Sequence, residues 1–143
     1  MGSPERELHP DLSPEDRRIL FQRGIDLFNA QRFYDCHEAF EEIWRSTTPE
    51  PRDLFQGLIQ VAVGFYHDLE RQRPDVARRV LAKGRRRLEL LSSQDLGEFG
   101  IDLMGLLASV MAWEHWLETC EVPRPPLPKL RRLAGSSDFD HGS

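Results

Sequence analysis

The chain has 143 residues, of which 39% are hydrophobic and 30% are charged. This length suits one folded domain with its own core, and this composition excludes a wholly disordered protein. The net charge of −5 argues against a protein that coats nucleic acid with its whole surface. The longest apolar run, near Leu103 to Trp113, is too short to span a bilayer, so we expect no membrane partner.

The two cysteines, Cys36 and Cys120, provide neither a disulfide framework nor a paired set of metal ligands. The first residues also lack the apolar stretch of a secretory signal. We therefore expect a cytoplasmic protein in a reducing compartment. Residues 1–12 and 134–143 are predicted to be flexible, on either side of a single helical domain over residues 13–133.

The first two predicted helices have recognisable starts. Ser13 is followed by a proline and two acidic residues, which is typical of a helix N-terminus. Asp35 and Glu38 have the spacing of a capping box and predict a second helix that runs to about Ser46. Two prolines then break the chain within residues 47–51.

The third predicted helix, over residues 52–70, is the stretch around which the rest of the chain is organised. Residues 54–67 are apolar almost all the way round at helical pitch, as in a helix that lies in the middle of a fold. Three polar residues fall along one narrow stripe of this helix: Gln56, Gln60 and His67. A buried polar group without a partner costs about 1–3 kcal/mol, so we expect polar groups to face this stripe.

Two more helices are predicted, over residues 74–92 and 101–118, with a polar, Gly-containing loop over residues 93–100. The four prolines of residues 122–128 exclude a helix and predict an extended segment against the bundle. No stretch alternates with a period of two over a useful length. The predicted fold class is all-α, a compact bundle of about five helices with an extended Pro-rich C-terminal segment.

Polar residues on the second and third helices form a candidate site. His37, Glu41 and Trp44 recur at i, i+4 and i+7 and therefore share one helix face. Gln60 and His67 lie on the polar stripe of the third helix. We expect these residues to meet in a polar cluster between the two helices.

Glu114 falls in the middle of the apolar face of the last helix, where a lone carboxylate is rarely tolerated, so we add it to the cluster. Three interpretations are open. The cluster is a divalent-metal site held by His37, Glu41 and His67, a metal-free pocket for a small ligand, or a purely structural polar core. If the protein is an enzyme, a metal-assisted hydrolase is the reaction class we expect, with a metal-bound water as nucleophile. The reaction and its substrate are not specified.

A different function is suggested by the first two predicted helices. They resemble half of a tetratricopeptide repeat, with small residues such as Gly24 and Ala39 where the helices would touch. A structural or protein-interaction module is therefore the alternative to a ligand site, and the partner is then a protein rather than a small molecule. The basic stripe of residues 78–87 has no interleaved aromatic residues, so we do not expect a nucleic-acid partner. The oligomeric state is left open.

The polar residues of the candidate site also carry a family resemblance. The pattern His-x-x-x-Glu-x-x-Trp at positions 37–44, with Leu-Ile-Gln at 58–60 and His67, resembles the signature of a small bacterial and archaeal all-helical family of unknown function. The resemblance covers roughly residues 24–91. It implies a prokaryotic origin, a compact helical fold and a role for these residues as the family's signature, and it implies no activity.

Overall fold

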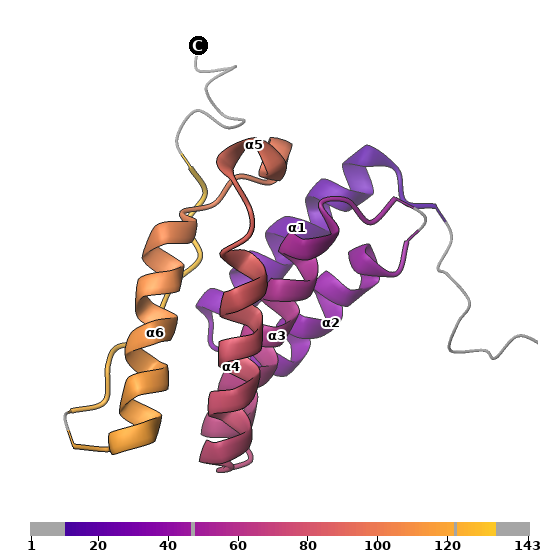
Figure 1. Cartoon of the computed structure of the whole chain (residues 1–143). Coiled ribbons are helices and arrows are strands. Elements are labelled where there is room, and N and C mark those ends of the chain that lie inside the picture. Colours follow the sequence, from indigo (N-terminus) through magenta and orange to yellow (C-terminus); the bar gives the residue numbers. More distant parts are fainter. Residues whose placement is uncertain (1–10, 47, 122, 134–143) are drawn as a thin grey trace, which may run out of the picture.

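The computed structural model describes residues 11–46, 48–121 and 123–133. Residues 1–10 and 134–143, most of the two segments predicted to be flexible, lie outside this part. Within it, helices joined by short connections make up the bundle (Figure 1), and an isolated backbone bridge between Ile101 and Arg132 is its β-type pairing. The prediction of a compact all-α bundle is confirmed. None of the described helices combines the length and apolarity needed to cross a membrane.

Helix α1 (Pro14–Asn29) begins where the sequence predicts. The side-chain oxygen of Ser13 accepts a hydrogen bond from the backbone N–H of Asp16 at 3.0 Å. This bond satisfies one of the N–H groups that a helix start leaves without a partner. The helix buries Phe21, Gly24, Ile25 and Phe28.

Helix α2 (Phe33–Trp44) begins earlier than predicted, and the assignment of Asp35 as its cap is wrong. Asp35 lies inside the first turn, where its carboxylate accepts a hydrogen bond from Arg32 at 2.5 Å. Gln31 adopts a left-handed backbone with φ of 64°, which reverses the chain just before the helix. Phe33 packs edge-on against Phe28 of α1 with ring centroids 5.1 Å apart, so burial of this ring sets the start of α2.

Helix α3 (Arg52–Leu69) lies at the centre of the bundle, as predicted, and packs against both α2 and α4. Its fully buried side chains are Leu54, Phe55, Leu58, Val61, Ala62 and Phe65. The Phe65 ring also meets the Trp113 ring of α6 edge-on, with centroids 5.4 Å apart. Helix α3 therefore contacts α2, α4 and α6.

Helix α4 (Pro74–Leu88) approaches α3 closely because glycines lie at the contact. A Cβ atom on Gly84 would lie 2.9 Å from the backbone oxygen of Gly57. A Cβ atom on Gly64 would lie 2.7 Å from the side chain of Leu81. Larger residues at these positions would force the two helices apart.

The predicted loop over residues 93–100 contains helical turns that the sequence reading missed. These are α5 (Ser93–Leu96) and the 3₁₀ helix η2 (Gly97–Phe99). The backbone N–H of Ser92 donates to the Asp95 carboxylate at 2.8 Å as part of a capping box. Phe99 then packs against Phe21 and Phe55, so this segment closes one end of the core.

Helix α6 (Leu103–Thr119) packs against α4, on the side of α4 away from α1 and α2 (Figure 1). After α6, the C-terminal segment (residues 123–133) runs back along the bundle without helix, as its prolines predict. The side-chain amide of Asn29 donates from Nδ2 to the Leu130 carbonyl at 3.1 Å, and its Oδ1 accepts from the Leu130 N–H at 2.7 Å. Trp113 donates its indole N–H to the carbonyl of Pro126 at 3.1 Å.

Candidate functional site

Two of the predicted site residues border one cavity between α2 and α3. The cavity has a volume of about 210 Å³ and is lined by Tyr34, His37, Val63, Tyr66 and His67. The ring of Tyr34 lies 4.9 Å from that of His37 and 5.4 Å from that of Tyr66, measured between centroids. We call these five residues the histidine pocket. The two tyrosines were missed by the sequence reading, although each lies beside a predicted histidine, at i−3 and i−1.

A hydrogen bond to the backbone defines the tautomer of His37 in the histidine pocket. Its Nδ1 lies 2.7 Å from the backbone carbonyl oxygen of Tyr34, which can only accept a hydrogen bond, so Nδ1 carries the hydrogen. In the neutral ring, Nε2 is therefore a hydrogen-bond acceptor. In the protonated ring, Nε2–H is directed towards Glu41, whose Oε1 lies 3.6 Å away. The side chains of His37 and Glu41 thus lie next to each other along one helix face, as their spacing predicts.

His67 is held in an environment that disfavours its charged form. Burial lowers the pKa of its imidazole, and the positive charges of Arg73 and Arg71 lower it further. Its Nδ1 is buried and has no hydrogen-bond partner within the described part of the chain. This environment therefore favours the neutral ring, and its Nδ1 has no partner among the residues that the structure describes.

Glu41 and Trp44 lie on the same face of α2 as His37, as the spacing predicts, but neither lines the histidine pocket. Glu41 Oε2 accepts from Arg45 at 3.3 Å. Trp44 packs against the core, and its indole Nε1 is buried without a hydrogen-bond partner among the described residues.

Gln60 and Glu114 lie elsewhere, so the expected gathering of all six residues does not occur. The Gln60 side-chain oxygen accepts from Arg87 of α4 at 3.4 Å. Glu114 forms a bidentate ion pair with Arg85. Its Oε2 accepts from Nε at 2.5 Å and its Oε1 accepts from Nη2 at 3.0 Å, and the pair joins α6 to α4. Arg85 also donates to Glu89 at 2.8 Å, so Glu114 is a partly buried structural carboxylate with its charge compensated.

The metal interpretation receives no support from the arrangement of ligands. Within the described ranges, no group of three or more His, Cys, Asp or Glu side chains could hold a metal ion. His37 and His67 share a cavity, while Glu41 is directed to His37 and Arg45. The three predicted ligands therefore do not converge on one point.

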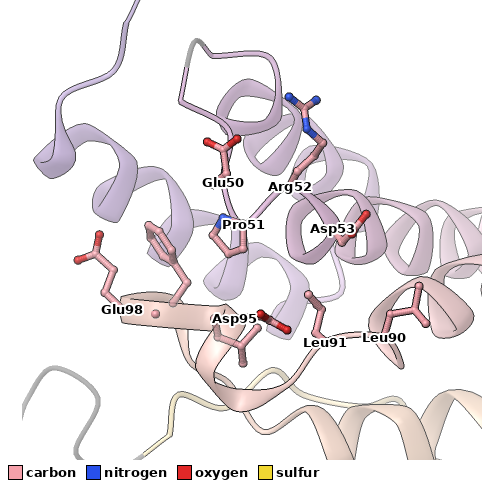
Figure 2. A pocket seen from close by; sticks show the side chains of 11 residues that line it. Glu50, Pro51, Arg52, Asp53, Leu90, Leu91, Asp95 and Glu98 are labelled. Carbon is pink, nitrogen blue, oxygen red and sulfur yellow. The ribbon is translucent and has the colours of Figure 1, made fainter.

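Another cavity, of about 540 Å³, lies at the start of α3 (Figure 2). Glu50, Pro51 and Arg52 border it on one side, and Asp95 and Glu98 of the α5–η2 segment border it on the other. Its carboxylates largely serve the fold. Asp95 caps α5, Glu98 pairs with Arg18 at 3.3 Å, and Asp53 pairs with Arg87 at 3.0 Å. We do not assign a ligand to this cavity.

Cys36 is a core residue. Its side chain is fully buried, and burial raises the pKa of its thiol far above the usual range. Cys120, by contrast, is exposed just after α6.

Comparison with known proteins finds a similarity for part of the chain. No curated protein and no solved structure matches it. Residues 21–80 match the model of a family described as a domain of unknown function, DUF309. The matched residues run from α1 into α4 and include the whole histidine pocket but not Glu114. Over this part the chain is therefore similar to a domain-of-unknown-function family, as the sequence pattern indicates.

Proposed function

We propose that this protein binds a small, uncharged molecule in the histidine pocket, and that the molecule has an apolar ring or chain and one hydroxyl group. The proposal concerns binding and assigns no reaction. The observation that carries it is a single cavity with aromatic walls and two imidazoles, one of which has a buried nitrogen without a partner.

The size and walls of the pocket define the apolar part of the ligand. A cavity of about 150 Å³ can hold one benzene molecule, so the 210 Å³ here accommodates one ring with a short substituent. Tyr34 and Tyr66 supply aromatic faces, and Val63 supplies an aliphatic one. Such walls favour a planar or compact apolar group.

The imidazoles define the polar part. Nε2 of neutral His37 accepts a hydrogen bond, because Nδ1 already donates to the Tyr34 carbonyl. The ligand must therefore offer a donor such as a hydroxyl. Burial of His67 and the charges of Arg71 and Arg73 disfavour an imidazolium, so a ligand anion would gain no positive histidine here.

Phenol is a suitable first probe. Toluene is the control ligand, because it has a similar size and shape but carries a methyl group in place of the hydroxyl. We expect phenol to shift the backbone amide NMR signals of residues 34–37 and 63–67, and to bind roughly tenfold more tightly than toluene, as for one hydrogen bond. His37→Phe keeps a ring and removes the acceptor, so it should reduce phenol affinity to that of toluene. His115→Phe is the matched control, because His115 is exposed on α6 and distant from the pocket residues in sequence.

Two results would contradict the proposal. One is phenol-induced shifts that scatter over the surface or do not saturate. The other is unchanged phenol binding in a folded His37→Phe variant. Loss of folding in that variant, with no ligand response in the wild type, would instead favour the structural polar core as the role of these residues.

A further inference from the structure

A third cavity, of about 380 Å³, lies where α3 and α6 end, outside the histidine pocket. Asp68 lies in the last turn of α3, Trp116 and Leu117 lie near the end of α6, and Arg124 lies in the segment that follows. The volume is within the range of roughly 300–1,000 Å³ that is usual for small-molecule sites. This cavity combines an anion, a cation and an apolar wall.

One oxygen of Asp68 lacks the partner that a structural carboxylate would have within the described part of the chain. Its Oδ2 is buried and has no hydrogen-bond partner among the described residues. Its position in the last turn of α3 places it at the negative end of the helix dipole, which disfavours an anion. Burial raises the pKa of the Asp68 carboxyl, and the nearby charge of Arg124 only partly opposes this effect. A bound cation would relieve all three unfavourable features.

Among the described residues, the guanidinium of Arg124 contacts two aromatic rings and forms no ion pair with a carboxylate. The central carbon of its guanidinium lies 5.0 Å from the ring centroid of Trp116 and 5.6 Å from that of Trp113. Aromatic rings do not take up the N–H donors of the guanidinium as a carboxylate would, so these donors can bind an anion. The charge of Arg124 acts on Asp68, yet Asp68 Oδ2 accepts no hydrogen bond from it.

We propose that this cavity binds a small zwitterion of the α-amino-acid class. The ammonium group of the ligand contacts Asp68, its carboxylate contacts the guanidinium edge of Arg124, and its side chain packs on Trp116 and Leu117. An amine alone would leave Arg124 without a counter-ion, and a carboxylate alone would face the Asp68 charge. Charge complementarity at both ends therefore selects the zwitterion.

Three probes that share one side chain test this assignment. L-leucine carries both charges, 3-methylbutylamine lacks the carboxylate, and 4-methylpentanoate lacks the ammonium. We expect L-leucine to give saturable shifts of the amide NMR signals of residues 68–72 and 116–121, and each of the other two to bind at least roughly tenfold more weakly. Asp68→Asn and Arg124→Gln should each weaken L-leucine binding by a similar factor. Their controls are Asp75→Asn and Arg79→Gln, which change exposed residues of α4.

Cys120 gives an independent readout, because it lines the cavity and is exposed, whereas Cys36 is buried. Alkylation with iodoacetamide should modify Cys120 selectively, and L-leucine should slow that reaction in the wild type but not in Asp68→Asn.

The proposal is overturned if L-leucine, L-methionine and L-phenylalanine show no saturable binding up to roughly 10 mM. It is also overturned if 3-methylbutylamine binds as tightly as L-leucine, since Arg124 then has no role. His37→Phe should leave L-leucine binding unchanged, so failure at this cavity and failure at the histidine pocket can be distinguished.

Discussion

The chemistry of individual residues depends on neighbours that helical pitch does not specify. His37 and Glu41 are four residues apart on one helix, and the structure brings their side chains together as the spacing predicts. Gln60 and His67 are seven residues apart on α3, and pitch alone places them on one stripe. The stripe is nevertheless divided, because Gln60 meets Arg87 of α4 whereas His67 borders a cavity shared with α2.

Glu114 illustrates the same limit. Its position on an apolar helix face correctly indicated a carboxylate that needs a partner. The partner is Arg85, and the basic residues around it in α4 gave no sign that this arginine turns inwards while Arg86 is exposed. Which of several arginines meets a buried acid depends on the packing of α6 on α4, and that packing is not encoded within either helix.

His67 makes a prediction about pH. Its pKa is lowered in the folded protein, while in the unfolded chain it has an ordinary value of about 6.5. Protons therefore bind more tightly to the unfolded chain. The stabilising contribution is complete above the unfolded pKa and is lost as the pH falls towards the lowered value. We expect the wild type to lose more thermal stability than His67→Gln between about pH 7.5 and pH 5.

The measurement is the melting temperature of both proteins across this pH range. The pKa of neighbouring Asp68 is raised, so it contributes with the opposite sign in both proteins. The difference between the two curves thus isolates the histidine. Parallel curves would show that the imidazole titrates equally in the folded and unfolded states, contrary to the expected burial effect.

At the scale of elements, the sequence specifies where most helices begin and says little about their contacts. Ser13 predicted the start of α1 correctly because its cap uses only neighbouring backbone. The predicted start of α2 was wrong. A helix capped by Asp35 would leave Phe33 outside it, whereas α2 begins at Phe33, whose ring is buried against Phe28. The capping pair Ser92 and Asp95 was present in the sequence but was missed, since α5 has only four residues and no periodicity to accompany it.

Packing between α3 and α4 leaves little room for a larger residue at Gly84. Gly84→Ala would place a methyl group 2.9 Å from the Gly57 carbonyl oxygen and 3.0 Å from side-chain atoms of Gln60 and Val61. The backbone oxygen cannot move without moving α3. We expect a loss of about 1–3 kcal/mol from overpacking, which exceeds the gain of up to about 1 kcal/mol from replacing a helical glycine.

Chemical denaturation of Gly84→Ala measures this difference. Lys83→Ala, at the exposed neighbouring position, should change the free energy of unfolding by no more than about 0.5 kcal/mol. A Gly84→Ala variant as stable as the wild type would mean that the two helices separate slightly at little cost. The close approach would then not be a requirement of the fold.

At the scale of the whole molecule, the C-terminal segment ties the first helix to the last. Leu130 is nearly completely buried, and both of its backbone polar groups bond to the side chain of Asn29 at the end of α1. Pro126 accepts the indole N–H of Trp113 from α6. The sequence predicted that this segment would be extended, because proline excludes helix. It did not reveal that Asn29 anchors this segment, because asparagine is common at the C-terminal ends of helices for local reasons.

This anchor makes the last prediction. Asn29→Ala removes both hydrogen bonds and leaves the buried Leu130 N–H and carbonyl without their partner, a loss of about 1–3 kcal/mol. The segment then keeps the buried side chain of Leu130, the bond from Trp113 to Pro126, and the contacts of residues 131–133 with neighbouring parts of the bundle. We expect the segment to open before the bundle does, because fewer contacts hold it than hold α3.

Amide hydrogen exchange tests this order directly. In Asn29→Ala, exchange at residues 127–133 should accelerate roughly tenfold or more, while that of α3 amides such as Val61 changes much less. Arg23→Ala, on the exposed face of α1, should leave both sets unchanged. Equal acceleration of the two sets would show that the segment and the bundle open together, as one cooperative unit. The Asn29 anchor would then stabilise the whole fold and not the C-terminal segment alone.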